Sequence, residues 1–112
     1  MQDVIEQLLG EMQRAKLSER RTEPRHPFVR PIRIHLPHGP TLGAFSKDIS
    51  ALGIGIVCDS TINIGSMATL EIHSTKGAPV FLRSEVRWCD TYGSGWYLVG
   101  WKFIAIGTRS MA

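Results

Sequence analysis

The chain has 112 residues, of which 43% are hydrophobic and 21% charged, so it suits one soluble globular domain and is too short for a catalytic domain joined to a regulatory one. No apolar stretch is long enough to span a bilayer, and Asp3 and Glu6 stand where a secretory signal carries positive charge, so we expect a cytoplasmic protein. Two cysteines, Cys58 and Cys89, are too few for a disulfide framework, and their apolar surroundings predict small buried side chains.

Positive charge is concentrated in one part of the chain. Residues 14–35 hold seven arginines and lysines against two glutamates, whereas the remaining residues carry a net charge of −2. Guanidinium groups match phosphate oxygens in bidentate geometry, so a basic segment joined to a mildly acidic body favours an anionic partner. A solvated surface gives the same pattern, so charge alone does not define a site.

Residues 1–17 are expected to form an N-terminal amphipathic α-helix, whose regular part covers residues 3–17. Asp3 followed by Glu6 resembles a capping box, and apolar side chains recur at helical spacing at Val4, Ile5, Leu8, Met12 and Ala15. A helix of this length is marginal on its own. Its apolar stripe should therefore pack on the domain, on a second copy of the chain in a homodimer, or on another protein.

Residues 18–27 are predicted to form an extended basic linker, because they show no hydrophobic period and contain Pro24 and Pro27. The segment holds five charged residues and no apolar anchor. We therefore expect the linker to be loosely attached in the free protein and to become ordered when a ligand binds.

Beyond the linker the hydrophobic period changes to two, which predicts β-strands. The inward rows are Ile32, Ile34 and Leu36, then Ala68, Leu70 and Ile72, then Leu82, Val86 and Trp88, and last Tyr97, Val99, Trp101 and Phe103. Turn-forming clusters at residues 37–40, 63–65, 76–79 and 92–95 separate them. The pattern predicts a mostly β protein, a six-stranded antiparallel β-barrel over residues 28–106 with a short tail at 107–112.

Two short motifs stand apart from this barrel pattern. The first is Arg-x-x-x-Arg at Arg21 and Arg25 in the linker, with Arg20 in front of it. The second is Asp-x-Ser-x-x-Gly at the junction of two predicted strands, formed by Asp48, Ser50 and Gly53. In this order, with 22 residues between Arg25 and Asp48, the pair resembles the signature of the PilZ domain family. Three further segments resemble strands of that family, namely 53–56, 85–88 and 100–103, so the resemblance covers residues 20 to about 105.

The resemblance implies a PilZ-like barrel that binds the bacterial second messenger cyclic di-GMP. Arg21 and Arg25, assisted by Arg20, would hold the phosphates and guanines of this dinucleotide. Arginine suits that role because it is bidentate to phosphate and to guanine O6 and N7, and because it stacks on bases.

The second motif and one tryptophan complete the implied site. Asp48 would accept hydrogen bonds from a guanine or hold an arginine in place, Ser50 would donate to an oxygen, and Gly53 would leave room where backbone and ligand meet. Trp88 matches a position near the ligand in some relatives. Its place in the alternating pattern, however, favours packing in the core.

Each of these residues also has a purely structural interpretation. The arginines could form a solvated linker, while Asp48 and Ser50 could close a strand-end turn through local side-chain-to-backbone hydrogen bonds. Gly53 and Gly55 could mark a β-bulge. The simultaneous presence of both motifs on a chain that independently predicts a barrel favours the binding role.

Other kinds of site are not indicated. The histidines lack ligand-like spacing with the cysteines, so no zinc site is predicted at His26, His35, His38 or His73. No nucleophile is paired with a base and no two acids form a catalytic pair, so we expect neither an enzyme nor a bound cofactor.

Three functions are weighed on this basis. The leading hypothesis is a cyclic di-GMP receptor and adaptor in which the ligand bridges the linker to the barrel and repositions the N-terminal helix toward a downstream protein. The first alternative is a ligand-independent PilZ-like interaction module. The second is a barrel that binds single-stranded nucleic acid, which is disfavoured because residues 14–35 contain one aromatic side chain, Phe28, and such proteins depend on stacking platforms.

Overall fold

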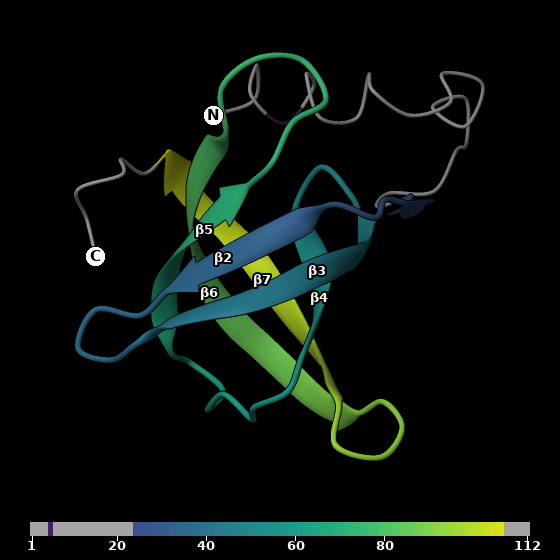
Figure 1. The fold of residues 1–112 in the computed structure, drawn as a ribbon, viewed down its shortest axis with the longest axis vertical. Helices are drawn as coiled ribbons and strands as arrows, with labels where there is room; N and C mark the ends of the chain where they lie inside the picture. Colours follow the sequence, from purple (N-terminus) through teal and green to yellow (C-terminus); the bar gives the residue numbers. More distant parts are fainter. Residues whose placement is uncertain (1–4, 6–23, 107–112) are drawn as a thin grey trace.

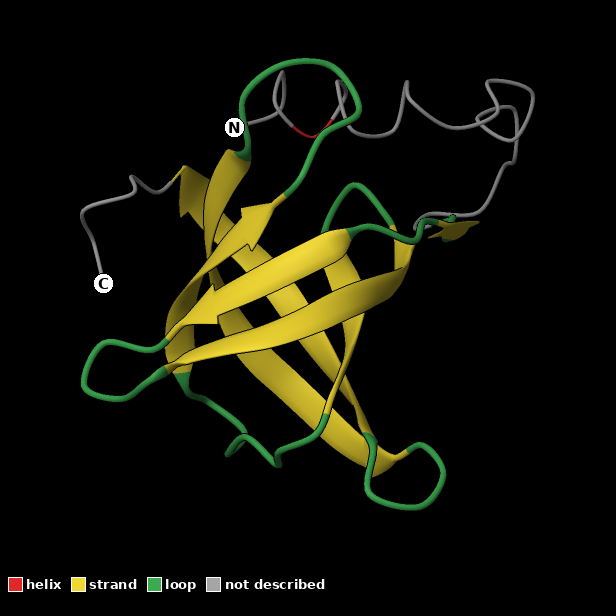
Figure 2. Ribbon diagram, in the orientation of Figure 1, coloured by secondary structure: helices red, strands yellow, loops and turns green. Residues whose placement is uncertain are grey.

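The computed structural model describes Ile5 and residues 24–106, and the regular secondary structure of residues 24–106 consists of β-strands joined by loops (Figures 1 and 2). The strands in chain order are β1 (His26–Pro27), β2 (Pro31–His35), β3 (Thr41–Ile49), β4 (Gly53–Cys58), β5 (Met67–Ile72), β6 (Val80–Thr91) and β7 (Tyr97–Ile106). The predicted helix over 3–17 and the tail at 107–112 lie outside the described residues, except for Ile5. Ile5 is helical, fully buried and part of the hydrophobic core.

Six of the strands close into an antiparallel barrel, as the sequence predicts. Their order around the barrel is β3-β2-β5-β6-β7-β4, and the pairing of β4 with β3 closes the ring. The short β1 occupies the edge of β3 beyond the end of β2, with His26 opposite Ile49 and Pro27 opposite Asp48. Closure of so small a barrel bends its strands sharply, and bulges interrupt β3 between Ser46 and Asp48, β6 between Val86 and Trp88, and β7 at Ile104.

The core fills the barrel with the side chains that the period of two assigns to it. Buried residues from the predicted inward rows include Ile32, Ile34, Ala68, Leu70, Ile72, Leu82, Val86, Val99, Trp101 and Phe103. β4 is buried along its whole length, and its inward side chains are Ile54, Ile56 and Cys58. Cys58 is fully buried, as predicted, and this burial raises the pKa of its thiol, whereas Cys89 is only partly buried.

Two parts of the chain differ from the sequence-based expectation. The hydrophobic pattern did not reveal β3, although burial alternates along it from Thr41 to Lys47, because polar Ser46 is buried and apolar Phe45 is exposed. The end of the linker is also more firmly attached than expected. His26 is buried and paired with β3, and the Phe28 amide donates to the Lys47 carbonyl at 3.0 Å, so Pro24–Pro27 cannot be described as an unanchored segment.

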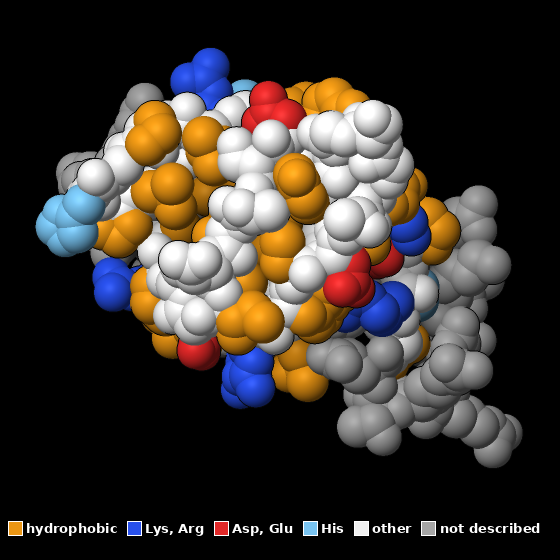
Figure 3. All heavy atoms as spheres, turned by 90° about the horizontal axis from the view of Figure 1, so that it is seen from below, with side chains coloured by type: hydrophobic (Ala, Val, Ile, Leu, Met, Phe, Trp, Pro, Cys, Tyr) orange, Lys and Arg blue, Asp and Glu red, His pale blue; other side chains and the backbone are white. Residues whose placement is uncertain are grey.

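The β6–β7 hairpin ends in a tight turn at one end of the barrel. Gly93 and Gly95 both have positive φ, a backbone conformation that glycine adopts without strain. Figure 3 shows this end of the molecule, where apolar side chains are interspersed with polar ones. Trp96 beside the turn contacts Phe45 of β3, with their ring centroids 6.2 Å apart.

Within the described residues no helix is long and apolar enough to cross a membrane.

The core assignment predicts a sharp contrast between two isoleucines. Ile34→Ala removes a fully buried side chain and should lower the free energy of unfolding by about 2–5 kcal/mol. Ile64→Ala, at a position 69% exposed, should change it by less than about 0.5 kcal/mol. Urea unfolding followed by circular dichroism measures both. Equal effects would contradict the placement of β2 in the barrel wall.

Candidate ligand-binding site

The two sequence motifs meet at the edge of the barrel where β1 joins β3. The antiparallel register of β1 and β3 brings Arg25, just before β1, beside the end of β3. The Arg25 guanidinium donates to Asp48 Oδ1 from Nη2 at 2.6 Å and from Nε at 3.2 Å, and Nη1 lies 3.5 Å from Ser50 Oγ. Residues that are 23 positions apart in sequence therefore form one polar cluster.

The contact between Arg25 and Asp48 is partly open to solvent. The side chains are 38% and 23% exposed, and Lys47 Nζ lies 3.5 Å from the second Asp48 oxygen, Oδ2. Ion pairs with this exposure contribute at most about 1 kcal/mol to stability. The contact therefore orients the guanidinium more than it stabilises the barrel.

Ser50 builds the turn between β3 and β4. Its amide donates to the Gly53 carbonyl at 2.8 Å, and its buried Oγ accepts from the amides of Leu52 at 3.2 Å and Gly53 at 3.1 Å. Gly53 is required by the packing of β4 on β7, because a Cβ there would overlap the Trp101 carbonyl oxygen. These two motif residues thus shape the backbone beside Asp48.

The bulge in β3 turns Asp48 to the outside of the barrel. Ser46 lies opposite Ile56 and Asp48 lies opposite Gly55, so Lys47 is the extra residue of the bulge. Without the bulge, Asp48 would follow Ser46 into the interior. A Cβ on Gly55 would lie 2.8 Å from Asp48 Oδ1, so the carboxylate has room there only because residue 55 is glycine.

The prediction that Trp88 packs in the core, which followed from its place in the alternating pattern, is wrong. The β6 bulge between Val86 and Trp88 reverses the alternation, and the indole lies on the outer face with 39% of the residue exposed. Its ring lies over Gly100 of β7, where a Cβ would overlap it. Asp48, Gly55, Gly100 and Trp88 are neighbours across four strands, so a carboxylate and an indole flank a floor of two glycines.

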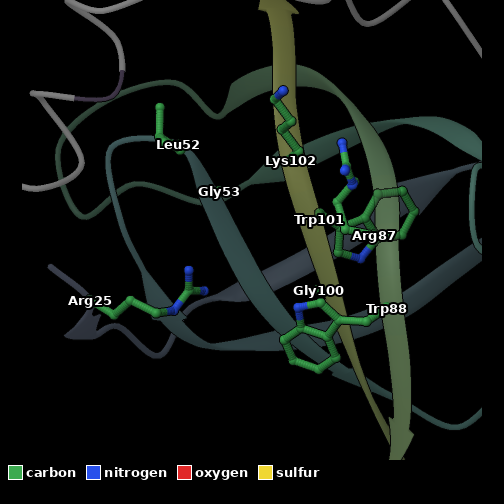
Figure 4. Close-up of a pocket in the computed structure, with 8 residues that line it drawn as sticks. All are labelled: Arg25, Leu52, Gly53, Arg87, Trp88, Gly100, Trp101 and Lys102. Atoms are coloured by element: carbon green, nitrogen blue, oxygen red, sulfur yellow. The ribbon is translucent and has the colours of Figure 1, made fainter. Parts of the chain in front are cut away.

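A pocket of about 330 Å³ opens beside this floor. It is lined by Arg25, Leu52, Gly53, Arg87, Trp88, Gly100, Trp101 and Lys102. Figure 4 shows Arg25 on one side of the pocket, with Arg87 and Trp88 on the other. Three cations and an exposed indole around one pocket can bind a flat anionic ligand.

The structure brings together most of the residues singled out in the sequence. Arg25, Asp48 and Ser50 form the polar cluster, and Gly53 and Trp88 line the pocket with Arg25. Arg20 and Arg21 lie outside the described residues. The sequence motifs missed several lining residues, namely Leu52, Arg87, Gly100, Trp101 and Lys102. Within residues 24–106 no group of three His, Cys, Asp or Glu side chains is placed to hold a metal ion.

A closed six-stranded barrel in which these two motifs are in contact defines a small β-barrel domain of the PilZ type. The family model described as "PilZ domain" matches residues 19–112, and the chain belongs to this family.

Among solved structures, the chain is similar to the Bacillus subtilis inhibitor of motility MotI/DgrA, with a TM-score of 0.64 and 20% sequence identity. The match covers 83% of this chain and 46% of that one, so the chain spans less than half of the neighbour's length. A likeness at this level of identity reflects a shared fold. No curated protein sequence matches the chain.

The glycine floor makes a testable prediction. Gly100→Ala places a Cβ inside the Trp88 ring position, so the indole must move, at a cost of roughly 1–3 kcal/mol in unfolding free energy. Gly43→Ala is the matched control, because a Cβ on this β3 glycine meets no atom within 4 Å. In NMR spectra the indole N–H resonance of Trp88 should shift in G100A and stay in place in G43A. An unshifted resonance in G100A would contradict the contact.

Proposed function

We propose that this protein is a cytoplasmic receptor for cyclic di-GMP that passes the occupancy of its pocket to a downstream protein. The observation that carries the proposal is the contact between the two motifs, in which Arg25 lies against Asp48 and Ser50 at the pocket. Membership of the PilZ domain family supports the same ligand, since domains of this family are generally cyclic di-GMP receptors.

Arg25 is a proposed phosphate ligand. A guanidinium carries five N–H donors, and Asp48 engages those on Nε and Nη2. Because the side chain is still partly exposed, its other donors can bind a phosphate oxygen while Asp48 keeps the group in place. In this proposal Arg20 and Arg21 supply further guanidinium groups for the phosphates and guanines.

The guanine bases have two proposed partners on the barrel. The exposed Trp88 indole offers a stacking surface, and stacking on an aromatic side chain contributes about 1–3 kcal/mol per base. Asp48 Oδ2, which contacts Lys47 at 3.5 Å, can accept from a guanine N1–H or exocyclic amine. Gly100 in the pocket lining lets the Trp88 indole lie flat against the backbone of β7, where a base can stack on its other face.

The chemistry of the lining suits recognition. The side chains around the pocket are cationic, aromatic, aliphatic or absent, and they offer contacts to charge and to a flat ring. We therefore propose a receptor and adaptor without catalytic activity. A ligand-independent PilZ-like interaction module is the alternative, and direct binding measurements separate the two.

Selectivity is the first test of the receptor. Titration calorimetry should detect binding of cyclic di-GMP and much weaker binding of GTP, because only the cyclic dimer presents two phosphodiesters and two guanines. A short oligonucleotide tests the nucleic-acid alternative in the same format. Equal affinity for GTP, or no binding of cyclic di-GMP, would reject the proposed function.

Arg25→Ala separates ligand binding from stability. Loss of charge-assisted hydrogen bonds should weaken cyclic di-GMP binding by about 1.5–3 kcal/mol. The free energy of unfolding should change by less than about 1 kcal/mol, because the ion pair with Asp48 is partly exposed. Arg33→Ala, an exposed arginine on β2 outside the pocket lining, is the control and should retain affinity. A destabilised R25A protein with normal affinity would identify Arg25 as a structural residue.

Asp48→Ala tests the second motif. Removal of the carboxylate releases Arg25 and deletes the proposed guanine acceptor, so affinity should fall while the circular dichroism spectrum of the barrel is preserved. Asp90→Ala, an exposed acid on β6 away from the pocket lining, controls for the change in net charge. If D48A unfolds, or binds as tightly as D90A, the proposed recognition role of Asp48 is wrong.

A further inference from the structure

Two cations outside both family motifs face the same pocket as Arg25. Arg87 lies on β6 and Lys102 on the neighbouring strand β7, and both side chains are exposed and line the pocket. In Figure 4 Arg87 lies across the pocket from Arg25, and Lys102 lies on the strand next to that of Arg87. The pocket therefore has positive charge on two sides.

The β6 bulge explains why Arg87 can take part. Val86 lies opposite Trp101 and Trp88 lies opposite Gly100, so Arg87 is the extra residue and has no partner in the ladder. In a regular strand Arg87 and Trp88 would face opposite sides of the wall. The bulge redirects the chain so that both side chains line the pocket, as bulges near binding sites often do.

Within the described part of the chain, neither of these cations is held in an ion pair. Glu85 lies opposite Lys102 in the β6–β7 register, yet among the residues that the structure describes no ion pair joins an acid to Lys102 or Arg87. Asp48 is engaged by Arg25 and Lys47. Uncompensated charges of one sign in a concave site concentrate the field and favour an anion there.

We propose that Arg87 and Lys102 bind the phosphodiester of the ligand that Arg25 does not reach. This inference rests on the proposed function, because it assigns the second phosphate of a cyclic dinucleotide. The two phosphodiesters of such a ligand lie on opposite sides of its ring, and the cations lie on opposite sides of the pocket. Arg87 and Lys102 thereby make the pocket selective for a ligand with two phosphodiesters over one with a single phosphodiester.

Calorimetry with two probes tests this selectivity. Cyclic di-GMP carries two phosphodiesters, whereas cyclic GMP carries one phosphodiester and one guanine. R87A and K102A should each weaken cyclic di-GMP binding by roughly tenfold, the effect of losing one charge-assisted hydrogen bond. Cyclic GMP binding should change much less, so the preference for the dinucleotide falls. The affinity of each variant for cyclic di-GMP should also become less sensitive to salt.

Matched controls separate a local contact from a change in overall charge. Arg83→Ala removes an exposed arginine from the same strand, and Lys76→Ala removes an exposed lysine, and neither residue lines this pocket. Both variants should keep the preference for cyclic di-GMP. Arg87→Lys retains the charge and should restore part of the lost affinity.

The outcomes distinguish this inference from the function on which it rests. If wild-type protein does not bind cyclic di-GMP, the receptor proposal fails and this assignment fails with it. A different result overturns this inference alone. In that case wild-type protein binds cyclic di-GMP and R25A weakens binding, but R87A and K102A have the same affinity and the same preference for cyclic di-GMP as the controls R83A and K76A. A reduced preference in R87A and K102A that is absent from the controls supports it.

Discussion

Closure of a six-stranded barrel bends its strands, and the bulges that accompany this bending create the site. A bulge reverses the inward–outward alternation of a strand. In β3 it turns Asp48 outward, and in β6 it turns Trp88 outward. Asp48 comes two positions after buried Ser46, and Trp88 comes two positions after buried Val86. In a regular strand both side chains would therefore point into the barrel. The barrel's curvature and the position of its pocket thus have one physical origin.

The outward side chains impose a second requirement on the neighbouring strands. Asp48 lies against residue 55 and Trp88 against residue 100, and a Cβ at either position would come too close to the side chain beside it. Glycine at both positions lets the carboxylate and the indole lie close to the backbone. A site on this wall therefore depends on glycines as much as on charged residues.

The sequence predicted those parts of the fold and site that follow a regular rule. Strands with a period of two were found. Holding an arginine in place was one of the two roles that the resemblance implied for Asp48, and its carboxylate is paired with Arg25. The hydrophobic pattern missed β3 because its exposed Phe45 is apolar and its buried Ser46 is polar. Trp88 was assigned to the core because counting alternate positions assumes a strand without a bulge. Arg87 and Lys102 were missed because exposed cations have no distinguishing pattern, and their shared pocket exists only in three dimensions.

The attachment of β1 limits how a bound ligand could act on the rest of the protein. His26 is buried, the Phe28 amide is bonded to Lys47, and Arg25 is already oriented by Asp48. A preorganised guanidinium reduces the entropy lost on binding. It also leaves little for the ligand to reorganise at β1 itself. On the proposed function, β1 and the barrel wall therefore serve as the fixed support of the site.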